Sequence, residues 1–147
     1  MRLERQISFC LEARDPTEAS ALLAAPERAL ARLAVFRDLK LMNGVLSGAL
    51  AAPFVLIGEV RFPFRSRFEL GGDMARLEPE PLANEGDAAA ELSGSARTEG
   101  NRVCYQARVA LELYLPEGEK WGGRAFRKMA EAAFERTLKR TLHEIGG

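Results

Sequence analysis

The chain offers few side chains whose chemistry suits catalysis. His143 is the only histidine among the 147 residues, and histidine is the most common general base in enzymes. It falls in the last turn of the last predicted helix, where the helix dipole favours a cation. A catalytic triad or a histidine–metal site would need this side chain in a buried cleft. We therefore expect a solvated His143, no catalytic residue, no metal site, no cofactor and no enzymatic activity.

The two cysteines, Cys10 and Cys104, are far apart and lack the spacing of metal ligands. Each occupies a polar position in an alternating strand pattern, and no sequence neighbour clearly activates either thiol. We interpret them as two inert thiols near the surface of a sheet. Because this cysteine usage shows no disulfide framework, it favours a reducing cytosol.

Several arginines fall on the polar face of predicted strands, where a row of guanidinium groups would suit phosphate or RNA. However, Glu59 and Glu69 flank the row, and no exposed aromatic residues interleave with it as base-stacking side chains would. Lys plus Arg and Asp plus Glu both total 21, so no global field attracts nucleic acid or anionic membrane. We expect a solvated, ion-paired face and no nucleic-acid partner. The arginines are Arg61, Arg65, Arg67, Arg76 and Arg97.

One set of apolar residues shares the inward positions of predicted strands and of the last helix. Two interpretations stand equally: a packed core, or a ligand pocket lined by aromatic side chains and a pliable methionine. Small inward residues such as Ala107 and Ala133 leave room for a ligand. Tyr105 is the best polar group inside, because a buried hydroxyl needs a partner. The set comprises Phe62, Phe64, Phe68, Tyr105, Val109, Phe126, Met129 and Phe134.

The elements that position these residues follow from periodicity. Leu3 to Leu11 alternates with polar residues, which predicts a half-buried strand. Asp15 and Glu18 form a helix-start signal, and Pro26 interrupts the helix, so two short helices follow the strand. Turn residues then separate further predicted strands, and we expect Ala52-Pro53 to end the second of them. These strands run over Val35–Met42, Val45–Ala51, Glu59–Leu70, Met74–Glu80, Ala88–Arg97 and Arg102–Leu115.

Apolar residues recur at spacings of three and four from Trp121 onward, which predicts one long helix from about Lys120 to Ile145. Strands joined by short turns imply an antiparallel sheet, and a long helix must cover its apolar face. The chain is therefore expected to be a single α+β domain over residues 1–147. It has no signal-peptide pattern and no run of 18 apolar residues, so we expect a soluble, cytoplasmic protein. A composition rich in Ala, Arg, Leu and Glu suggests a bacterial source.

The order of strand, broken helix pair around Pro26, strand meander and helix over Trp121–Ile145 resembles the START-like (SRPBCC) superfamily. That resemblance implies the helix-grip (START/Bet v 1-like) fold, with a curved antiparallel sheet of about seven strands around the C-terminal helix. Gly48, the Phe54–Leu70 hairpin and Ala88–Gly94 loosely resemble relatives of the G-type subunit of carbon monoxide dehydrogenase. The fold would also make the first and last strands neighbours, so a redox pair of Cys10 and Cys104 stays an alternative.

The resemblance implies a lipid-like or cofactor-like ligand between the concave face of the sheet and the final helix. Our leading hypothesis is non-enzymatic binding of a small hydrophobic ligand in that cavity. The alternative is a protein-interaction or assembly module with a filled core, which would have a homo-oligomeric or protein partner. A cyclase-like enzyme is a third hypothesis, but it needs an inward acid or base that the long strand and the helix do not offer.

Overall fold

The computed structural model describes residues 2–54, 58–82, 86–113 and 123–146, and within the last helix it describes side chains for residues 127–141. The helices are α1 (Pro16–Leu23), α2 (Pro26–Ala29), the 3-10 turn η1 (Leu30–Arg32) and α3 (Gly123–Gly146). The strands are β1 (Arg2–Glu12), β2 (Phe36–Met42), β3 (Val45–Phe54), β4 (Gly58–Gly71), β5 (Met74–Pro79), β6 (Ala88–Glu99) and β7 (Arg102–Leu113).

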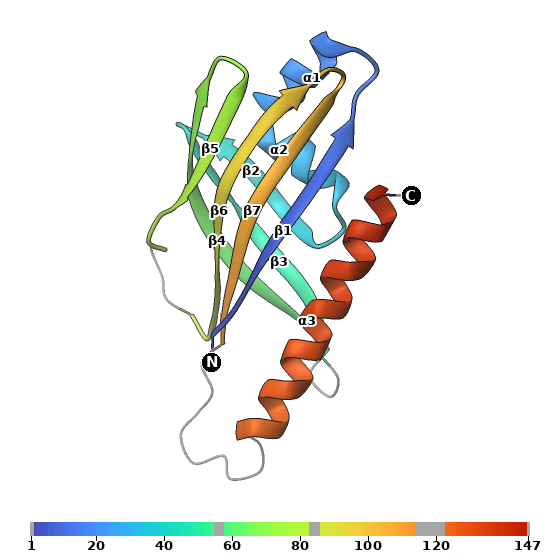
Figure 1. Ribbon diagram of the computed structural model, residues 1–147. Helices are drawn as coiled ribbons and strands as arrows, with labels where there is room; N and C mark the ends of the chain where they lie inside the picture. Colours follow the sequence, from blue (N-terminus) through green and yellow to red (C-terminus); the bar gives the residue numbers. More distant parts are fainter. Residues whose placement is uncertain (1, 55–57, 83–85, 114–122, 147) are drawn as a thin grey trace.

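The strands form one seven-stranded antiparallel sheet in the order β1-β7-β6-β5-β4-β3-β2. Consecutive strands from β2 to β7 are neighbours in the sheet, and only β1 joins its neighbour from the far end of the sequence. The sheet curls strongly, and α3 runs along its open side while α1 and α2 gather at one end (Figure 1). The expected α+β helix-grip fold, with two short helices after the first strand, is therefore confirmed.

Local sequence explains where the helices begin and what they cover. Asp15 caps α1 by accepting a hydrogen bond of 2.7 Å from the Glu18 backbone N–H, as the capping signal predicts. α3 packs against β1 and β3, and its buried side chains include Ala133, Phe134 and Leu138. Arg5 of β1 donates hydrogen bonds to Glu135 Oε1 at 2.6 and 2.9 Å, which ties the helix to the edge strand. The part of the predicted helix before Gly123, including Trp121, lies outside the described residues.

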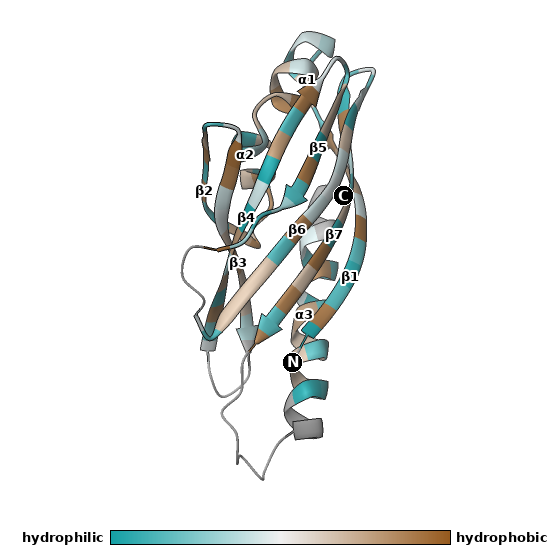
Figure 2. Ribbon diagram, turned by 90° about the vertical axis from the view of Figure 1, so that its left-hand side faces the viewer, coloured by the Kyte–Doolittle hydropathy of each residue, from teal (hydrophilic) through white to brown (hydrophobic). Residues whose placement is uncertain are grey.

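The core lies between the concave face of the sheet and these helices. Along β4, Phe62, Phe64 and Ser66 are buried while the intervening residues are exposed, as a period of two requires. Hydrophilic and hydrophobic residues also alternate along β5 and β7 (Figure 2). Leu70 departs from the alternation along β4. It occupies an inward position of the pattern but is exposed, because it lies near the β4–β5 turn.

The prediction that Ala52-Pro53 ends a strand is wrong, since β3 continues to Phe54. The pairing of β3 with β2 stops at Leu50, whereas its pairing with β4 continues through Pro53 opposite Glu59. The Ala51 N–H still donates to the Val35 carbonyl oxygen at 2.8 Å, and beyond Ala51 the described part of β3 pairs with β4 alone. A proline is tolerated in such a stretch, because its missing N–H is not needed on the unpaired side.

The interpretation of two separate thiols is also wrong: Cys10 and Cys104 form a disulfide that joins β1 to β7. The two residues lie directly opposite one another in the antiparallel register, with their Cα atoms 4.0 Å apart. Both cysteines occupy polar positions in the alternating pattern of their strands, which indicated surface thiols. The same alternation places both side chains on one face of the sheet. The cysteines therefore no longer support the inference of a reducing compartment.

β7 approaches β6 so closely at Gly94 that this position has no room for a side chain. The φ of Gly94 is +144°, and an added Cβ would lie 2.2 Å from the Gln106 carbonyl oxygen on β7. Replacement with alanine should therefore lower the free energy of unfolding by about 3 kcal/mol or more, through strain and displaced backbone. Gly71 is the matched control, because its Cβ would meet no atom within 4 Å, and Gly71→Ala should change stability by less than about 0.5 kcal/mol. Urea unfolding of the two variants measures the difference, and equal midpoints would contradict this account.

The disulfide closes a loop with a sequence separation of 94 residues. The double variant Cys10→Ser, Cys104→Ser should therefore lose about 2–5 kcal/mol of unfolding free energy, because its unfolded chain is no longer constrained. Urea unfolding without reductant gives this value. Wild-type protein unfolded in excess reductant should match the double variant. Identical stability with and without reductant would show that the bond does not constrain the unfolded chain.

Candidate functional site

The structure brings most of the predicted ligand-binding residues into one interior. Phe62, Phe64 and Phe134 are each 1% exposed, Val109 is fully buried and Tyr105 is 4% exposed. Phe68 is partly buried against the same core. Met129 is 37% exposed, and the side chain of Phe126 is outside the described residues. The interior is therefore close-packed around aromatic side chains, and Tyr105 is its most distinctive polar member.

Tyr105 is held in place by the pairing of β7 with β1. It lies opposite Phe9 in the register, and the two rings stack with centroids 5.2 Å apart. A second ring pair, Phe36 with Phe64, packs edge to face at 6.0 Å. The stacking on Phe9 fixes the tyrosine ring, so its hydroxyl has a defined position inside the fold.

Two buried oxygen atoms in this interior have no hydrogen-bond partner among the described residues. They are the Tyr105 hydroxyl on β7 and Oε2 of Glu27 on α2. The Glu27 charge is close enough to act on the tyrosine electrostatically. Burying a polar group without a hydrogen bond costs about 1–3 kcal/mol, so such a pair within an apolar core calls for a partner. Glu27 was missed by sequence analysis, because a helix of four residues has no periodicity that reveals an inward side chain.

The surroundings of Tyr105 determine its protonation. Burial, and secondarily the negative charge of Glu27, raise the pKa of the Tyr105 hydroxyl well above its ordinary value. The hydroxyl therefore stays protonated at neutral pH and acts as a hydrogen-bond donor. That behaviour suits the recognition of an acceptor and does not supply a general base.

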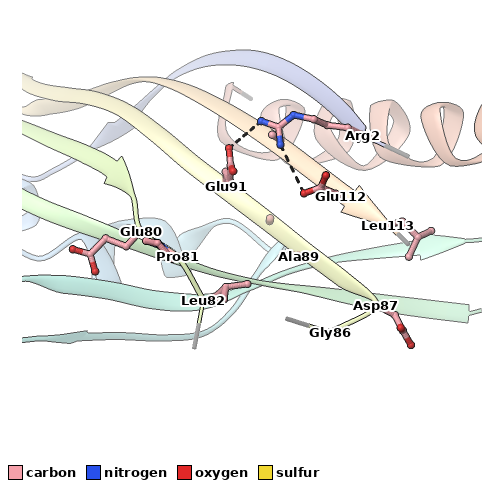
Figure 3. A pocket seen from close by; sticks show the side chains of 12 residues that line it. Arg2, Glu80, Pro81, Leu82, Gly86, Asp87, Ala89, Glu91, Glu112 and Leu113 are labelled. Carbon is pink, nitrogen blue, oxygen red and sulfur yellow. Dashed lines mark hydrogen bonds and ion pairs between the residues drawn. The ribbon is translucent and has the colours of Figure 1, made fainter. Parts of the chain in front are cut away.

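A pocket of about 600 Å³ lies elsewhere, on the outer face of the sheet, beside the start of β6 and the end of β7. On one side of the pocket Arg2 of β1 contacts Glu112 of β7 at 3.9 Å and reaches over β7 to Glu91 of β6 at 2.9 Å (Figure 3). Glu80 and Asp87 stand on the opposite side of the pocket. Because these walls are charged and Arg2 is already paired, the pocket is poorly suited to an apolar ligand.

The arginine row is ion-paired, as the sequence predicted. Arg61 contacts Asp38 at 2.9 Å, and Arg65 and Arg67 share Glu80 at 3.6 and 3.1 Å. Arg76 pairs with Glu78 and Arg97 with Glu99. These partners leave the guanidinium groups neutralised on an exposed face. His143 belongs to α3, but its side chain is outside the described residues.

Comparison with known proteins places the chain in a family. The family described as "Protein of unknown function (DUF3809)" matches residues 8–143. The chain belongs to the DUF3809 family. No curated protein matches its sequence.

Solved structures resemble the DUF3809 chain over nearly its whole length. The Zhui aromatase/cyclase from Streptomyces sp. R1128 has 13% identity and a TM-score of 0.55, with 99% of this chain and 92% of that chain covered. A protein from Thermus thermophilus has 17% identity and a TM-score of 0.50, with 97% of each chain covered. A START superfamily protein from Mycobacterium smegmatis has 12% identity, a TM-score of 0.46 and coverage of 99% and 97%.

At these identities the likeness to the first two structures establishes the fold of the DUF3809 chain and nothing beyond it. The expected START-like resemblance is confirmed at that level, while the resemblance to the carbon monoxide dehydrogenase subunit stays a prediction. One of the similar structures is an aromatase/cyclase, so the fold is one that also serves an enzyme. Among the described residues, no helix is both long and apolar enough to cross a membrane.

The raised pKa of Tyr105 predicts a specific dependence of stability on pH. The unfolded chain loses the tyrosine proton at about pH 10, whereas the folded chain retains it. Above about pH 10 the folded state therefore binds more protons, and stability falls by up to about 1.4 kcal/mol per pH unit from this group. Tyr105→Phe should remove that part of the decline. Urea unfolding between about pH 9 and 11 makes the comparison, and parallel curves for both proteins would contradict the burial of this hydroxyl.

Proposed function

We propose that this DUF3809 protein binds a small hydrophobic molecule that carries a hydroxyl group, without chemical conversion. The ligand enters between the concave face of the sheet and the C-terminal helix. The observation that supports this proposal is the pair of buried oxygens on Tyr105 and Glu27, which have no hydrogen-bond partner among the described residues and lie in a mainly apolar interior. A helix-grip fold supports it as well, because packed helices cover the open side of the sheet.

A single hydroxyl group matches the chemistry of this pair. It can donate its hydrogen to Glu27 Oε2 and accept the hydrogen of the Tyr105 hydroxyl. Both protein groups then gain the partner whose absence is costly in a buried site. A ligand without a hydroxyl leaves both groups unpaired, so the site discriminates by the penalty of desolvation.

The apolar part of the ligand is assigned to the aromatic residues of the interior. Burying apolar area contributes about 25 cal/mol per Å² before entropic costs. The proposed wall consists of Phe62, Phe64, Phe68, Val109, Phe126, Met129 and Phe134. Alanines at 130 and 133 on α3 are buried and small, so a modest outward shift of α3 is the proposed route for making space. Met129, a pliable and partly exposed residue of α3, is assigned to the entrance.

A matched pair of aromatic probes tests the proposal. Naphthol and naphthalene differ by one hydroxyl, and both can be followed by their own fluorescence. Wild-type protein should bind naphthol about tenfold more tightly, which corresponds to about 1.4 kcal/mol for the added hydrogen bonds. Tyr105→Phe should remove most of this preference while leaving the affinity for naphthalene nearly unchanged.

Thr137→Val is the matched control, because its hydroxyl donates to the Ala133 carbonyl of its own helix. That variant should retain the full preference for naphthol. Native mass spectrometry of the protein as purified adds a search for a co-purified small molecule. If neither probe binds and no small molecule co-purifies, the proposal is wrong, and a filled core that serves protein interaction becomes the better account.

A further inference from the structure

Three potential metal-ligating side chains meet on the outer face of the sheet, away from the interior site. They are Cys10 of β1, Cys104 of β7 and Glu99 at the end of β6. Their ligand atoms all lie within 4.8 Å of one another. Both cysteines are partly exposed, so solvent, a reductant or a metal ion can reach them.

The carboxylate of Glu99 is held against the sulfur by neighbouring arginines. Arg97 binds Oε1 at 2.8 Å, while Oε2 lies 3.2 Å from Cys104 Sγ. Arg102 lies 3.6 Å from Oε2. A sulfur in a disulfide carries no hydrogen, so the contact with Oε2 is not a hydrogen bond. The oxidised state therefore places a charged oxygen beside a group that cannot pair with it.

We propose that reduction of the disulfide converts this cluster into a binding site for a thiophilic divalent cation of the zinc class. The ligands are the thiolates of Cys10 and Cys104 and Oε2 of Glu99, and water occupies the fourth position. Two sulfur ligands and one carboxylate are a donor set that zinc accepts in tetrahedral geometry. Arg97 then acts as the partner that orients the ligating carboxylate.

The conversion balances in electrons and protons. One thiolate of a dithiol reductant attacks a sulfur of the Cys10–Cys104 bond and releases the other cysteine as a thiolate. The second thiolate of the reductant attacks the mixed disulfide, so the reductant is oxidised and the protein gains two electrons and two protons. When zinc binds, the two cysteine protons go to solvent and the metal does not change its oxidation state.

The backbone keeps the three ligands together after the disulfide opens. β1 and β7 pair without interruption from Arg2 opposite Glu112 to Glu12 opposite Arg102. The cysteine Cα atoms therefore stay opposed, and rotation of the side chains sets the sulfur separation. Two thiolates on one tetrahedral zinc are about 3.8 Å apart, a distance that cysteines opposed at 4.0 Å between Cα atoms can reach. The complex carries a charge of about −1, which Arg97 and Arg102 offset.

Because cobalt replaces zinc and gives a visible spectrum, it serves as the probe. The full-length protein is reduced with dithiothreitol, desalted without oxygen and titrated with Co²⁺, followed by displacement with Zn²⁺. We expect one Co²⁺ per reduced chain, with thiolate-to-cobalt absorption that Zn²⁺ abolishes, and none for the oxidised chain. Glu99→Gln should weaken the affinity at least about tenfold.

Glu91→Gln is the matched control, because Glu91 lies on the same strand and face and is also paired with an arginine. It should bind as the wild type does, and Cys10→Ser, Cys104→Ser should give no thiolate absorption. Glu99→Gln keeps both cysteines, so the test does not depend on the stability of the double variant. Wild-type affinity in Glu99→Gln, absence of thiolate–cobalt absorption in the reduced wild type, or loss of the sheet signal in circular dichroism on reduction would each overturn the proposal.

Discussion

The pairing of β1 with β7 is the constraint on which the rest of the structure depends. Every other strand pair joins neighbours in the sequence, whereas this pair brings together strands from opposite parts of the chain. It completes a curled sheet whose concave face is apolar and open on one side. Water would contact that face unless an element covered it, so α3 must pack across the opening against β1 and β3. The hydrogen bonds from Arg5 to Glu135 then link the covering helix to the strand that completes the sheet.

In a core closed in this way, a polar group without a hydrogen bond is costly. Two buried hydroxyl groups of this chain differ in whether they have a partner. Ser66 is fully buried, and it donates a hydrogen bond of 2.6 Å to the Leu92 carbonyl oxygen. Tyr105 is nearly as buried, yet neither its hydroxyl nor Oε2 of Glu27 is paired within the described residues. The fold can therefore provide a hydrogen-bond partner for a buried hydroxyl group, as it does for Ser66. The contrast supports a recognition role for the Tyr105–Glu27 pair. If the Tyr105 hydroxyl had no function, phenylalanine at this position would make the protein more stable, because it buries no unpaired polar group.

Most of the fold could be predicted from the sequence, because the signals that specify it are local. Alternation along β4 placed Phe62 and Phe64 inside, and the Asp15 signal located the start of α1. The failures arose where the outcome depends on a distant partner. β3 tolerates Pro53 only because its pairing with β2 ends before that residue, while its pairing with β4 continues past it. A sequence pattern does not contain that information. The disulfide depends on the register between strands from opposite parts of the chain, and Glu27 lies in a helix too short to show a face.

Both candidate sites depend on the same register, through adjacent residues of β7. Tyr105 points into the core and stacks on Phe9, while Cys104 points outward to Cys10. Since side chains alternate with a period of two, a slip of β1 by one residue would exchange the two faces of β1, turning Phe9 toward solvent and away from Tyr105, and the polar row of β1 inward. A covalent bond between directly opposed residues excludes that slip. The disulfide therefore does more than limit the unfolded chain, because while it is closed it fixes the register on which the interior site depends. When it opens, the register is maintained by the apolar face of β1 and by ion pairs between the strands, such as that of Arg108 with Glu4.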